Sequence, residues 1–328
     1  MPNILLTSEC NRKCPYCFAG NAMKGKAEQD RALSLEKAER LIQWLKKNGI
    51  DTFSMIGGEP TLHPEFEQIL EAVRTADMKA FVFSNGLMSD KKAACLAAWP
   101  DDQLGVLINV NDRDQYTDPE FQRLERTLGI LSGKASLGYN LYSLDFDFRP
   151  VARMAVDLGC RKRLRLGLAE PILGGENAFL APRDYPRIAE RLTDQAEEID
   201  RMDVAVGFDC GFVMCMFTTE QLGRLTACRA EISFACNPVV DISPALEAWA
   251  CFPLTLWEKV RVEDFPSLQA LQDHFSDKQR LYRRSGIYSH CLNCRFLIRG
   301  QCSGGCLSHV IRSFGRTDSA ATENERTA

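Results

Sequence analysis

Three cysteines lie close together near the start of the sequence, in the stretch TSECNRKCPYCFAG at residues 7–20. Cys10, Cys14 and Cys17 have the spacing C-x3-C-x2-C. Three thiolates can bind three irons of a [4Fe–4S] cluster and leave the fourth iron free for another ligand. A structural metal site fills its positions with protein ligands, whereas an open position is where a substrate or cofactor binds. The number of thiols therefore indicates a reactive cluster.

The 14 cysteines of the chain fall into two regions. Three lie at 10–17 and nine lie between 210 and 306, while Cys95 and Cys160 stand alone in predicted helices and fit small core positions. The N-terminus lacks the charged start and long apolar segment of a signal peptide, so tight cysteine spacings favour metal or cluster ligands over disulfides. Four histidines are too few for a protein built on Cys/His zinc sites, and zinc held by cysteines alone stays open as an alternative.

A second motif, GGEP, consists of Gly57, Gly58, Glu59 and Pro60 and ends a predicted strand at 50–58. Two glycines allow the backbone to approach a ligand closely, and the adjacent carboxylate can pair with an ammonium group. Either motif alone is a weak signal, because C-x3-C-x2-C can be half a zinc site and GGEP can be a plain turn. Together, at the ends of consecutive strands, the two motifs favour a single active site.

Strand and helix patterns alternate through the first 201 residues. Short apolar segments predict strands at 3–7, 50–58, 79–86, 103–111, 135–143 and 162–170. Amphipathic segments predict helices at 34–49, 63–76, 90–99, 119–131, 149–159 and 182–201. Six strand–helix units predict an α/β fold, a partial (β/α)6 TIM-like barrel that is open on one side and so admits a bulky substrate.

After residue 201 the pattern changes to short strands, frequent turns and dense cysteines. We predict a small cysteine-rich, cluster-binding C-terminal domain at 202–314, which depends on metal because its apolar core is small. The polar end at 315–328 is predicted to be disordered. The net charge of −4 gives no basic face for nucleic acid, and no apolar run is long enough to predict a membrane span. We therefore expect a cytoplasmic protein that binds neither nucleic acid nor membrane.

The two motifs resemble those of the radical S-adenosylmethionine (SAM) superfamily. Its signature C-x3-C-x-aromatic-C is matched by Cys10, Cys14, Tyr16 and Cys17, just after the first predicted strand. Its GGEP turn follows the second strand, as it does here. The resemblance implies that SAM binds the open iron of the core [4Fe–4S] cluster and that the GGEP turn meets the amino group of the SAM methionine.

Further contacts with SAM are implied at the ends of later strands, which face the active site in a barrel. They are Ser84, Asn85 and Gly86 after the third strand, Asn109, Asn111 and Asn140 near the ends of the fourth and fifth, and Arg165 on the sixth. For Arg165 and the asparagines of the fourth and fifth strands, a structural role is equally open.

The later cysteines resemble the SPASM extension that many radical SAM enzymes carry, which holds two auxiliary [4Fe–4S] clusters. By this resemblance the ligands of the first are Cys228, Cys236, Cys251 and Cys306, and those of the second are Cys291, Cys294 and Cys302. The spacing departs from the family pattern, because the gap between Cys294 and Cys302 is seven residues instead of five and no cysteine follows Cys306. We expect one or two auxiliary clusters, and zinc is the alternative occupant.

The fourth ligand of the second cluster has four candidates in the sequence, Asp209, Cys210, Cys215 and His309. Cys210 and Cys215 match none of the seven SPASM positions, and three roles are open for them. They can be cluster ligands, buried structural thiols or a catalytic thiol that donates a hydrogen atom to a substrate radical. A ligand or structural role is favoured for at least one of the two.

The resemblance implies reductive cleavage of SAM to a 5′-deoxyadenosyl radical, which abstracts a hydrogen atom from the substrate. Most comparable SPASM enzymes modify peptides or proteins, so the first hypothesis is crosslinking, epimerisation or side-chain oxidation of a ribosomally synthesised peptide. The cluster motif begins at residue 10, which leaves no room for an N-terminal leader-binding domain, so we expect either a separate leader-peptide recognition protein as a partner or none. A flavodoxin or ferredoxin is the expected reductant.

Two other classes of function stay open. One is a small-molecule radical SAM dehydrogenase or a related enzyme that modifies an aminocyclitol or a tetrapyrrole. The other is a non-catalytic iron–sulfur or zinc adapter. The adapter is disfavoured because it needs neither the GGEP turn nor an open iron.

Overall fold

The computed structural model describes residues 2–20, 27, 30–236 and 239–314, and the tail predicted to be disordered at 315–328 lies outside the described residues. The strands are β1 (Asn3–Leu5), β2 (Thr52–Ile56), β3 (Lys79–Ser84), β4 (Leu104–Asn109), β5 (Ala135–Leu141), β6 (Arg163–Leu168), β7 (Ala205–Phe208), β8 (Asp241–Ile242), β9 (Glu247–Trp249) and β10 (Val260–Arg261). The helices are α1 (Leu35–Lys47), α2 (Phe66–Thr75), α3 (Asp90–Ala97), α4 (Asp118–Ile130), α5 (Arg149–Asp157), α6 (Tyr185–Asp200), α7 (Thr219–Ala227), α8 (Leu268–Ser285) and α9 (Arg295–Ile298). Within these residues, no helix is long and apolar enough to cross a bilayer.

Local sequence signals set the helix boundaries. The Ser34 hydroxyl accepts a hydrogen bond from the backbone N–H of Lys37 and so caps α1. Thr117 and Glu120 form a capping box at the start of α4, in which each side chain accepts a hydrogen bond from the other residue's backbone. The six strands and six helices predicted in the first 201 residues are all present, with ends that differ by a few residues.

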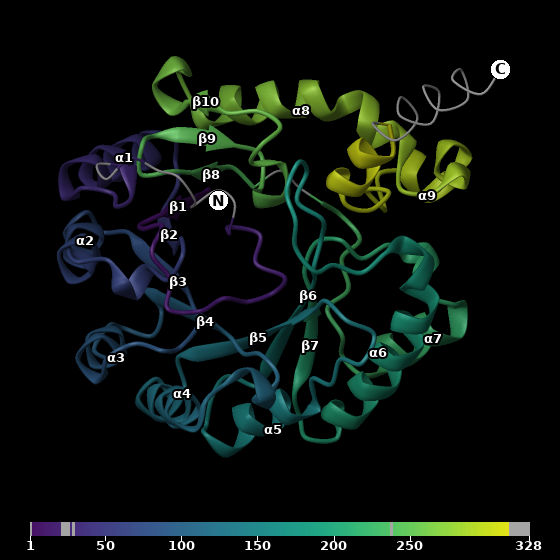
Figure 1. Cartoon of the computed structure of the whole chain (residues 1–328), viewed down its shortest axis with the longest axis horizontal. Helices are drawn as coiled ribbons and strands as arrows, with labels where there is room; N and C mark the ends of the chain where they lie inside the picture. The colour runs from purple at the N-terminus through teal and green to yellow at the C-terminus, as the bar shows by residue number, and fades with distance from the viewer. Residues whose placement is uncertain (1, 21–26, 28–29, 237–238, 315–328) are drawn as a thin grey trace, which may run out of the picture.

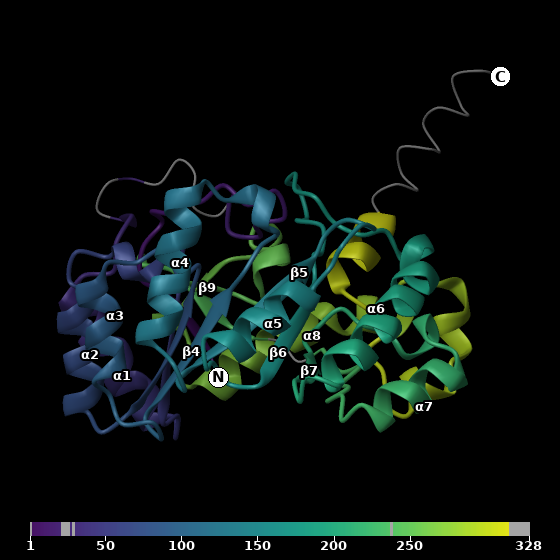
Figure 2. The same ribbon diagram turned by 90° about the horizontal axis from the view of Figure 1, so that it is seen from below.

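All described strands belong to one sheet, in the order β10-β9-β8-β1-β2-β3-β4-β5-β6-β7. From β1 to β7 every neighbouring pair is parallel, and the connecting helices form a ring outside the sheet (Figure 1). The view from below shows the strands slanting across the molecule behind α4 and α5 (Figure 2). The edge strands β10 and β7 do not pair with each other, so the sheet stays open. The predicted partial barrel is confirmed.

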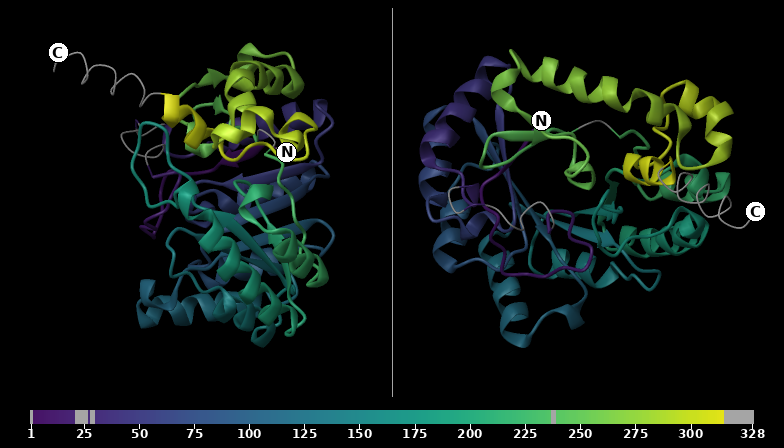
Figure 3. Two further views of the ribbon diagram at one scale, coloured as in Figure 1. Left: turned by 90° about the vertical axis from the view of Figure 1, so that its right-hand side faces the viewer. Right: turned by 45° about the horizontal axis from the view of Figure 1, so that its top comes forward.

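The residues after 201 extend this sheet at both of its edges. β7 pairs in parallel with β6, and β8 pairs in parallel with β1 on the other side, where β9 and β10 follow as an antiparallel ribbon. α8 runs along this ribbon toward α9 (Figures 1 and 3). The chain after α8 returns to the barrel, where the Tyr288 hydroxyl donates to the carbonyl of Pro182 at 2.6 Å. The boundary predicted at 201 therefore falls inside the sheet.

A row of buried polar side chains crosses three neighbouring strands. Asn3 on β1 is in register with Ser54 on β2 and with Asp241 on β8. The Asn3 amide donates to the Asp241 carboxyl at 2.8 Å, and the Ser54 hydroxyl donates to the Asn3 oxygen at 2.9 Å. Burial raises the pKa of Asp241 to about 8, because the charged form cannot be solvated there. This carboxyl group therefore holds its proton up to neutral pH.

Candidate functional site

The loop after β1 presents its first two thiols to hydrogen-bond donors. The backbone N–H of Arg12 donates to the Cys10 sulfur at 3.4 Å, and the Asn85 side-chain amide lies 3.9 Å from the same sulfur. The Asn111 side-chain amide donates to the Cys14 sulfur at 3.3 Å. N–H groups directed at sulfur stabilise thiolates and tune the potential of a cluster that they bind. Asn85 and Asn111, two predicted site residues, thus meet the cysteine loop directly.

The third thiol, Cys17, completes a group of three on one loop. Backbone N–H groups of Ala19 and Gly20 donate to it and oppose the effect of burial, which raises its pKa. Burial also raises the pKa of Cys10 to about 11, and the nearby Cys17 and Cys14 thiols raise it further. Thiols in such surroundings lose their protons when a cationic centre binds them. The donors and the proximity of the three thiols fit a cluster at this position.

Tyr16, between two of the cysteines, ties the loop to the ends of β4 and β5. Its hydroxyl donates to the side-chain oxygen of Asn111 and also forms a hydrogen bond with Asn140. Its ring packs against Tyr142, with 5.1 Å between ring centroids. The structure therefore brings Tyr16, Asn111 and Asn140 together, and it adds Tyr142, which follows β5. Its position near the end of the strand predicted at 135–143 was the only sequence signal for Tyr142.

The two glycines of the GGEP turn allow it to pack against the cysteine loop. A Cβ atom at Gly57 would lie 2.5 Å from the carbonyl oxygen of Thr7, and one at Gly58 would collide with the carbonyl of Glu9. The same carbonyls accept hydrogen bonds from the backbone N–H groups of Gly58 and Glu59, at 2.8 and 2.7 Å. The glycines were predicted to let the backbone approach a ligand. The structure shows that they let the GGEP turn approach the cysteine loop.

The carboxylate of Glu59 is used inside the protein. It accepts hydrogen bonds from the hydroxyls of Thr61 and Ser84 at 2.7 and 2.8 Å, and from the backbone N–H of Asn85 at 2.7 Å. The residue has no exposed surface. Burial raises the pKa of its carboxyl, and the hydrogen bonds from these donors lower it in part. These donors belong to the protein, and the expected pairing of this carboxylate with an ammonium group stays a prediction. Glu59 fixes the GGEP turn to the end of β3, and the backbone of the turn is what faces the cysteine loop.

Inward-facing asparagines lie across glycines of the next strand. A Cβ atom at Gly138 would lie 2.8 Å from the Asn109 side-chain oxygen, and one at Gly167 would lie 2.7 Å from that of Asn140. Within the described residues, the Asn109 oxygen is buried and has no hydrogen-bond partner. Asn109 therefore has an unused acceptor that the protein covers, whereas Asn140 forms a hydrogen bond with Tyr16.

Arg165 on β6 and Asp209 after β7 form an ion pair on the inner side of the sheet. Their side chains are 31% and 37% exposed, so the pair is open to the barrel interior. The Arg165 guanidinium also lies 6.0 Å from the centroid of the Phe83 ring on β3. Arg165 is thus a side chain of the barrel interior, and Asp209, one candidate fourth ligand, is engaged with it.

Four thiols gather where the C-terminal segment returns to β7. Burial raises the pKa of Cys251, and the nearby Cys236 and Cys210 thiols raise it further. Burial raises the pKa of Cys306 in the same way, and Cys251 and Cys236 again add to the effect. Cys236 also accepts a hydrogen bond from the Arg283 guanidinium at 3.3 Å. The fourth member of this group is Cys210, from the loop after β7.

A second group of four forms around the short helices that follow α8. Burial raises the pKa of Cys215 to about 11, and the nearby Cys291 and Cys302 thiols raise it further, ahead of Cys294. The backbone N–H of Gly304 donates to the Cys302 sulfur at 3.4 Å. Cys215 lies in the short helix Met214–Met216, so it reaches this group from the loop after β7. Cys215 is thus the fourth thiol of this group, for which the sequence has no cysteine after Cys306.

Cys228 is the one predicted ligand that the structure does not bring to a thiol group. It caps the C-terminus of α7 and is buried. Burial raises its pKa, and the charged groups that act on it most are Asp200 and Glu197 of α6, not other cysteines. Cys95 lies on α3 as predicted, and the buried Cys160 lies just beyond the end of α5 instead of within it.

His309, another candidate fourth ligand, is paired with a carboxylate. Its Nε2 atom lies 3.0 Å from the Glu170 carboxylate, and both side chains are almost fully buried. Glu170 is the last residue of the strand predicted at 162–170, yet its role was not predicted because its partner lies 139 positions away in the chain. The Glu170–His309 pair packs beside Cys306.

The thiol groups do not form a preformed site for a single ion. Among the described residues, no three or more His, Cys, Asp or Glu side chains converge closely enough to hold one metal ion. A [4Fe–4S] cluster binds each thiolate through a different iron, whereas one zinc ion binds all of its ligands itself. The occupant of the thiol groups stays a prediction.

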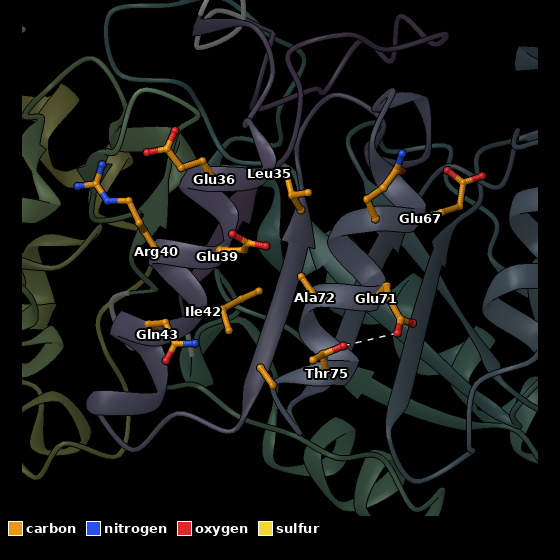
Figure 4. A pocket seen from close by; sticks show the side chains of 12 residues that line it. Leu35, Glu36, Glu39, Arg40, Ile42, Gln43, Glu67, Glu71, Ala72 and Thr75 are labelled. Atoms are coloured by element: carbon orange, nitrogen blue, oxygen red, sulfur yellow. Dashed lines mark hydrogen bonds between the residues drawn. The ribbon is translucent and has the colours of Figure 1, made fainter.

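Two surface hollows lie outside the barrel interior. One of about 1080 Å³ lies between α1 and α2 on the outer helical layer, where Glu39, Arg40 and Glu71 are among its lining residues (Figure 4). A smaller one of about 440 Å³ adjoins the cysteine loop and is lined in part by Asn11 and Tyr142. The first has no residue of the candidate site, whereas the second opens beside it.

Comparison with known proteins agrees with this geometry. Residues 4–127 match the family Radical_SAM, the radical SAM superfamily. A probable GTP 3′,8-cyclase of Methanocella arvoryzae is 29% identical over 205 residues, which are 60% of this chain and 64% of the relative. The chain thus spans slightly less than two thirds of that relative's length.

Three solved structures, of two proteins, share the fold over nearly the whole chain. Streptococcus suis SuiB bound to S-adenosylmethionine is 16% identical, has a TM-score of 0.66, and aligns with 95% of this chain and 74% of its own. SuiB bound to its precursor peptide SuiA has a TM-score of 0.65, with 16% identity, 95% of this chain and 72% of its own. Native anSMEcpe with bound AdoMet is 16% identical, with a TM-score of 0.65 and coverage of 93% and 89%.

The core of the chain is therefore a radical SAM domain, which comprises the cysteine loop, the GGEP turn and the first four strands. The partial barrel has the fold of SuiB and anSMEcpe.

Proposed function

We propose that the protein is a radical SAM enzyme with one core cluster and two auxiliary clusters, and that it modifies a ribosomally synthesised peptide or protein. The ligands of the core [4Fe–4S] cluster are Cys10, Cys14 and Cys17. Those of the first auxiliary cluster are Cys210, Cys236, Cys251 and Cys306. Those of the second are Cys215, Cys291, Cys294 and Cys302.

The observation that carries this proposal is the number of thiols in each group. Two groups contain four thiols each, and the loop after β1 contains three. Four thiols can complete the coordination of a cluster, whereas three leave one iron free, as the different roles require. Donors to sulfur accompany each group, from Asn111 at Cys14, Arg283 at Cys236 and Gly304 at Cys302. Cys210 and Cys215 thereby have structural roles as ligands and are not proposed as hydrogen-atom donors.

The residues around the core cluster bind and orient, and the cofactors supply the reactivity. When bound, the cluster and SAM supply reductive cleavage to a 5′-deoxyadenosyl radical, which takes a hydrogen atom from the substrate. Asn85 and Asn111 hold the thiols in place, and the backbone of the GGEP turn is positioned for the methionine end of SAM.

The charge of the barrel interior supports a peptide over a nucleotide substrate. The cation Arg165 is already neutralised by Asp209, and Asn109 and Asn140 beside it are uncharged. A triphosphate needs several unpaired cations or N–H donors, whereas a peptide is bound through amide and hydroxyl groups. The fold shared with SuiB, which has been solved with a precursor peptide, supports the same choice. The resemblance in sequence to GTP 3′,8-cyclases supports the small-molecule alternative.

An anaerobic assay tests both parts of the proposal, the cleavage of SAM and the peptide substrate. The protein is reconstituted with iron and sulfide, SAM and a strong reductant are added, and 5′-deoxyadenosine is measured by mass spectrometry with and without substrate. We expect candidate peptides to raise its yield by about tenfold or more and to change in mass, and GTP to leave it unchanged. Turnover of GTP to a product would overturn the peptide assignment.

A triple variant provides the control for the core cluster. Substituting Ala for Cys10, Cys14 and Cys17 is expected to abolish SAM cleavage and to leave the iron of the auxiliary clusters in place. Loss of all iron from this variant would contradict the division into separate clusters. Cleavage that persists in it would contradict the core site itself.

A further inference from the structure

The chain from 278 to 314 contains seven Lys and Arg residues and no Asp or Glu, although the whole chain has a net charge of −4. This segment comprises the end of α8, the short helix Ser289–Asn293, α9 and the residues that follow. It also carries four proposed cluster ligands, three of them in the second auxiliary cluster. A purely cationic segment in an acidic protein is a local feature that an interaction partner can recognise.

Several of these cations have no acidic partner. Lys278 pairs with Glu258, Arg280 pairs with Asp277, and Arg283 is engaged with Cys236. Within the described part of the chain, no ion pair is formed by Arg284, Arg295, Arg299 and Arg312, all of which are exposed. Their charge is therefore available to another molecule.

Exposed apolar side chains lie among these cations and next to the cluster ligands. Leu281, Leu292 and Ile298 are 75%, 63% and 73% exposed, which is unusual for residues of this size. Leu292 directly follows Cys291, and Ile298 lies one helical turn after Cys294, whose carbonyl accepts its backbone N–H at 3.0 Å. Leu292 and Ile298 thus lie within four residues of thiols of the second group, and Leu281 lies on α8 before them.

We propose that the surface formed by Arg284, Leu292, Arg295, Ile298 and Arg299 docks an acidic one-electron carrier protein, of the flavodoxin or ferredoxin kind, which reduces the second auxiliary cluster. This proposal rests on the proposed function, because it assumes the cluster on Cys215, Cys291, Cys294 and Cys302. In the transfer step, one electron leaves the reduced carrier and enters the cluster, and no bond or proton moves. Cations around an apolar centre are the complement of an acidic carrier's surface.

The position of the proposed cluster ligands near this surface favours an electron carrier as the partner. Electron transfer between proteins requires a short path from one redox centre to the other, and Cys291 and Cys294 lie within one helical turn of the exposed apolar side chains. A leader peptide or a nucleic acid would have no need of a cluster beneath its binding surface. The acid-free composition gives the carrier fast, salt-dependent association, as electrostatic steering predicts.

Reduction kinetics of the reconstituted full-length protein test the proposal. Photoreduced flavodoxin and an acidic [2Fe–2S] ferredoxin are mixed with it in a stopped-flow apparatus at low and high salt. The variant Arg284→Glu/Arg299→Glu is compared with Lys47→Glu/Arg153→Glu, which changes the charge equally on α1 and α5. Both control residues are exposed and lie on the outer helices.

The expected result is a second-order rate that falls with salt in the wild type and drops about tenfold or more in Arg284→Glu/Arg299→Glu at low salt. The control pair should change the rate less than about twofold. Leu292→Ser/Ile298→Ser should weaken carrier binding and keep the salt dependence, because its charges are intact. Equal losses in both charge-reversal variants, or a wild-type rate that salt does not affect, would overturn the docking surface. Stronger binding of a DNA oligonucleotide than of either carrier would overturn it too.

Photoreduced deazaflavin separates this proposal from the proposed function. This small reductant needs no docking surface, so it should reduce the clusters of all variants at the same rate, and all should contain the same iron and sulfide. Clusters missing from the wild type would refute the proposed function. Intact clusters that both carriers reduce at unchanged rates in Arg284→Glu/Arg299→Glu would refute the docking surface alone.

Discussion

The Asn111 amide donates to the Cys14 thiol at 3.3 Å, although 97 positions separate the two residues in the sequence. The same side chain accepts a hydrogen bond from the hydroxyl of Tyr16. One asparagine after β4 therefore holds both a proposed cluster ligand and the aromatic residue of the signature. The core cluster is consequently positioned by the barrel as well as by its own loop.

Replacing Asn111 tests this link. Asn111→Ala removes an N–H donor to sulfur, so the core cluster should have a more negative reduction potential and SAM cleavage should slow by about threefold to tenfold. Asn109→Ala is the matched control, because the Asn109 oxygen has no protein partner among the described residues. A redox titration followed by electron paramagnetic resonance measures the potential. If both variants shift it equally, the hydrogen bond to Cys14 has no special effect.

The carboxylate of Glu59 makes a prediction about stability. Glu59→Ala leaves the buried donors of Thr61, Ser84 and Asn85 without an acceptor, which should lower the free energy of unfolding by about 3 kcal/mol. Glu59→Gln keeps one acceptor and should cost about half as much. Urea unfolding with and without SAM measures both. A wild-type unfolding midpoint in Glu59→Ala, together with weakened SAM binding, would show that the carboxylate serves the ligand instead.

The iron content of cysteine variants distinguishes the ligands predicted from the sequence from those proposed from the structure. Cys210→Ser and Cys215→Ser should each lose about four irons per chain, because each removes one ligand of a different auxiliary cluster. Cys228→Ser should keep its full iron content, since Cys228 lies apart from the other thiols at the end of α7. Iron and sulfide analysis of reconstituted protein gives the answer, with Cys95→Ser as the control. Iron loss from Cys228→Ser alone would restore the assignment made from the sequence.

The motifs of the proposed core site could be found in the sequence because their signals are local. Cys10, Cys14, Tyr16 and Cys17 lie on one short loop, and GGEP lies on another, so spacing alone identifies them. The six strand–helix units were also predicted, because each has a periodic pattern of its own. Strand ends of a parallel sheet meet at one edge, which is why Asn85 and Asn111 could be assigned to the site before their contacts were known.

The remaining features depend on contacts between distant segments. Cys210 and Cys215 lie near the later cysteines because β7 joins the sheet and the chain after α8 returns to it. The spacing of residues along the chain does not indicate that the segment after α8 packs against the barrel. The use of Glu59 by the end of β3 was missed for the same reason, as was the 18-residue helix α8 in a region expected to have only short elements.

Asp241 predicts a pH dependence of stability. Its pKa is raised by burial from 3.8 to about 8, so its neutral form is the stable one in the folded protein. A group with a raised pKa stabilises the fold most below its unfolded pKa, and this stability is lost as pH rises toward 8. Asp241→Asn keeps an acceptor for Asn3 and has no charge to bury. The variant should therefore be more stable than the wild type at pH 8 by about 1 to 3 kcal/mol and similar to it near pH 4.

Anaerobic urea unfolding of both proteins at several pH values measures this difference. Comparing variant with wild type at each pH cancels the contributions of other buried acids, such as Glu59 and Glu170, which both proteins share. The difference in unfolding free energy should grow steadily between pH 4 and pH 8, the range that the raised pKa defines, and level off above it. A constant difference over this range would mean that Asp241 is ionised in the fold and that a cation not among its described partners stabilises it.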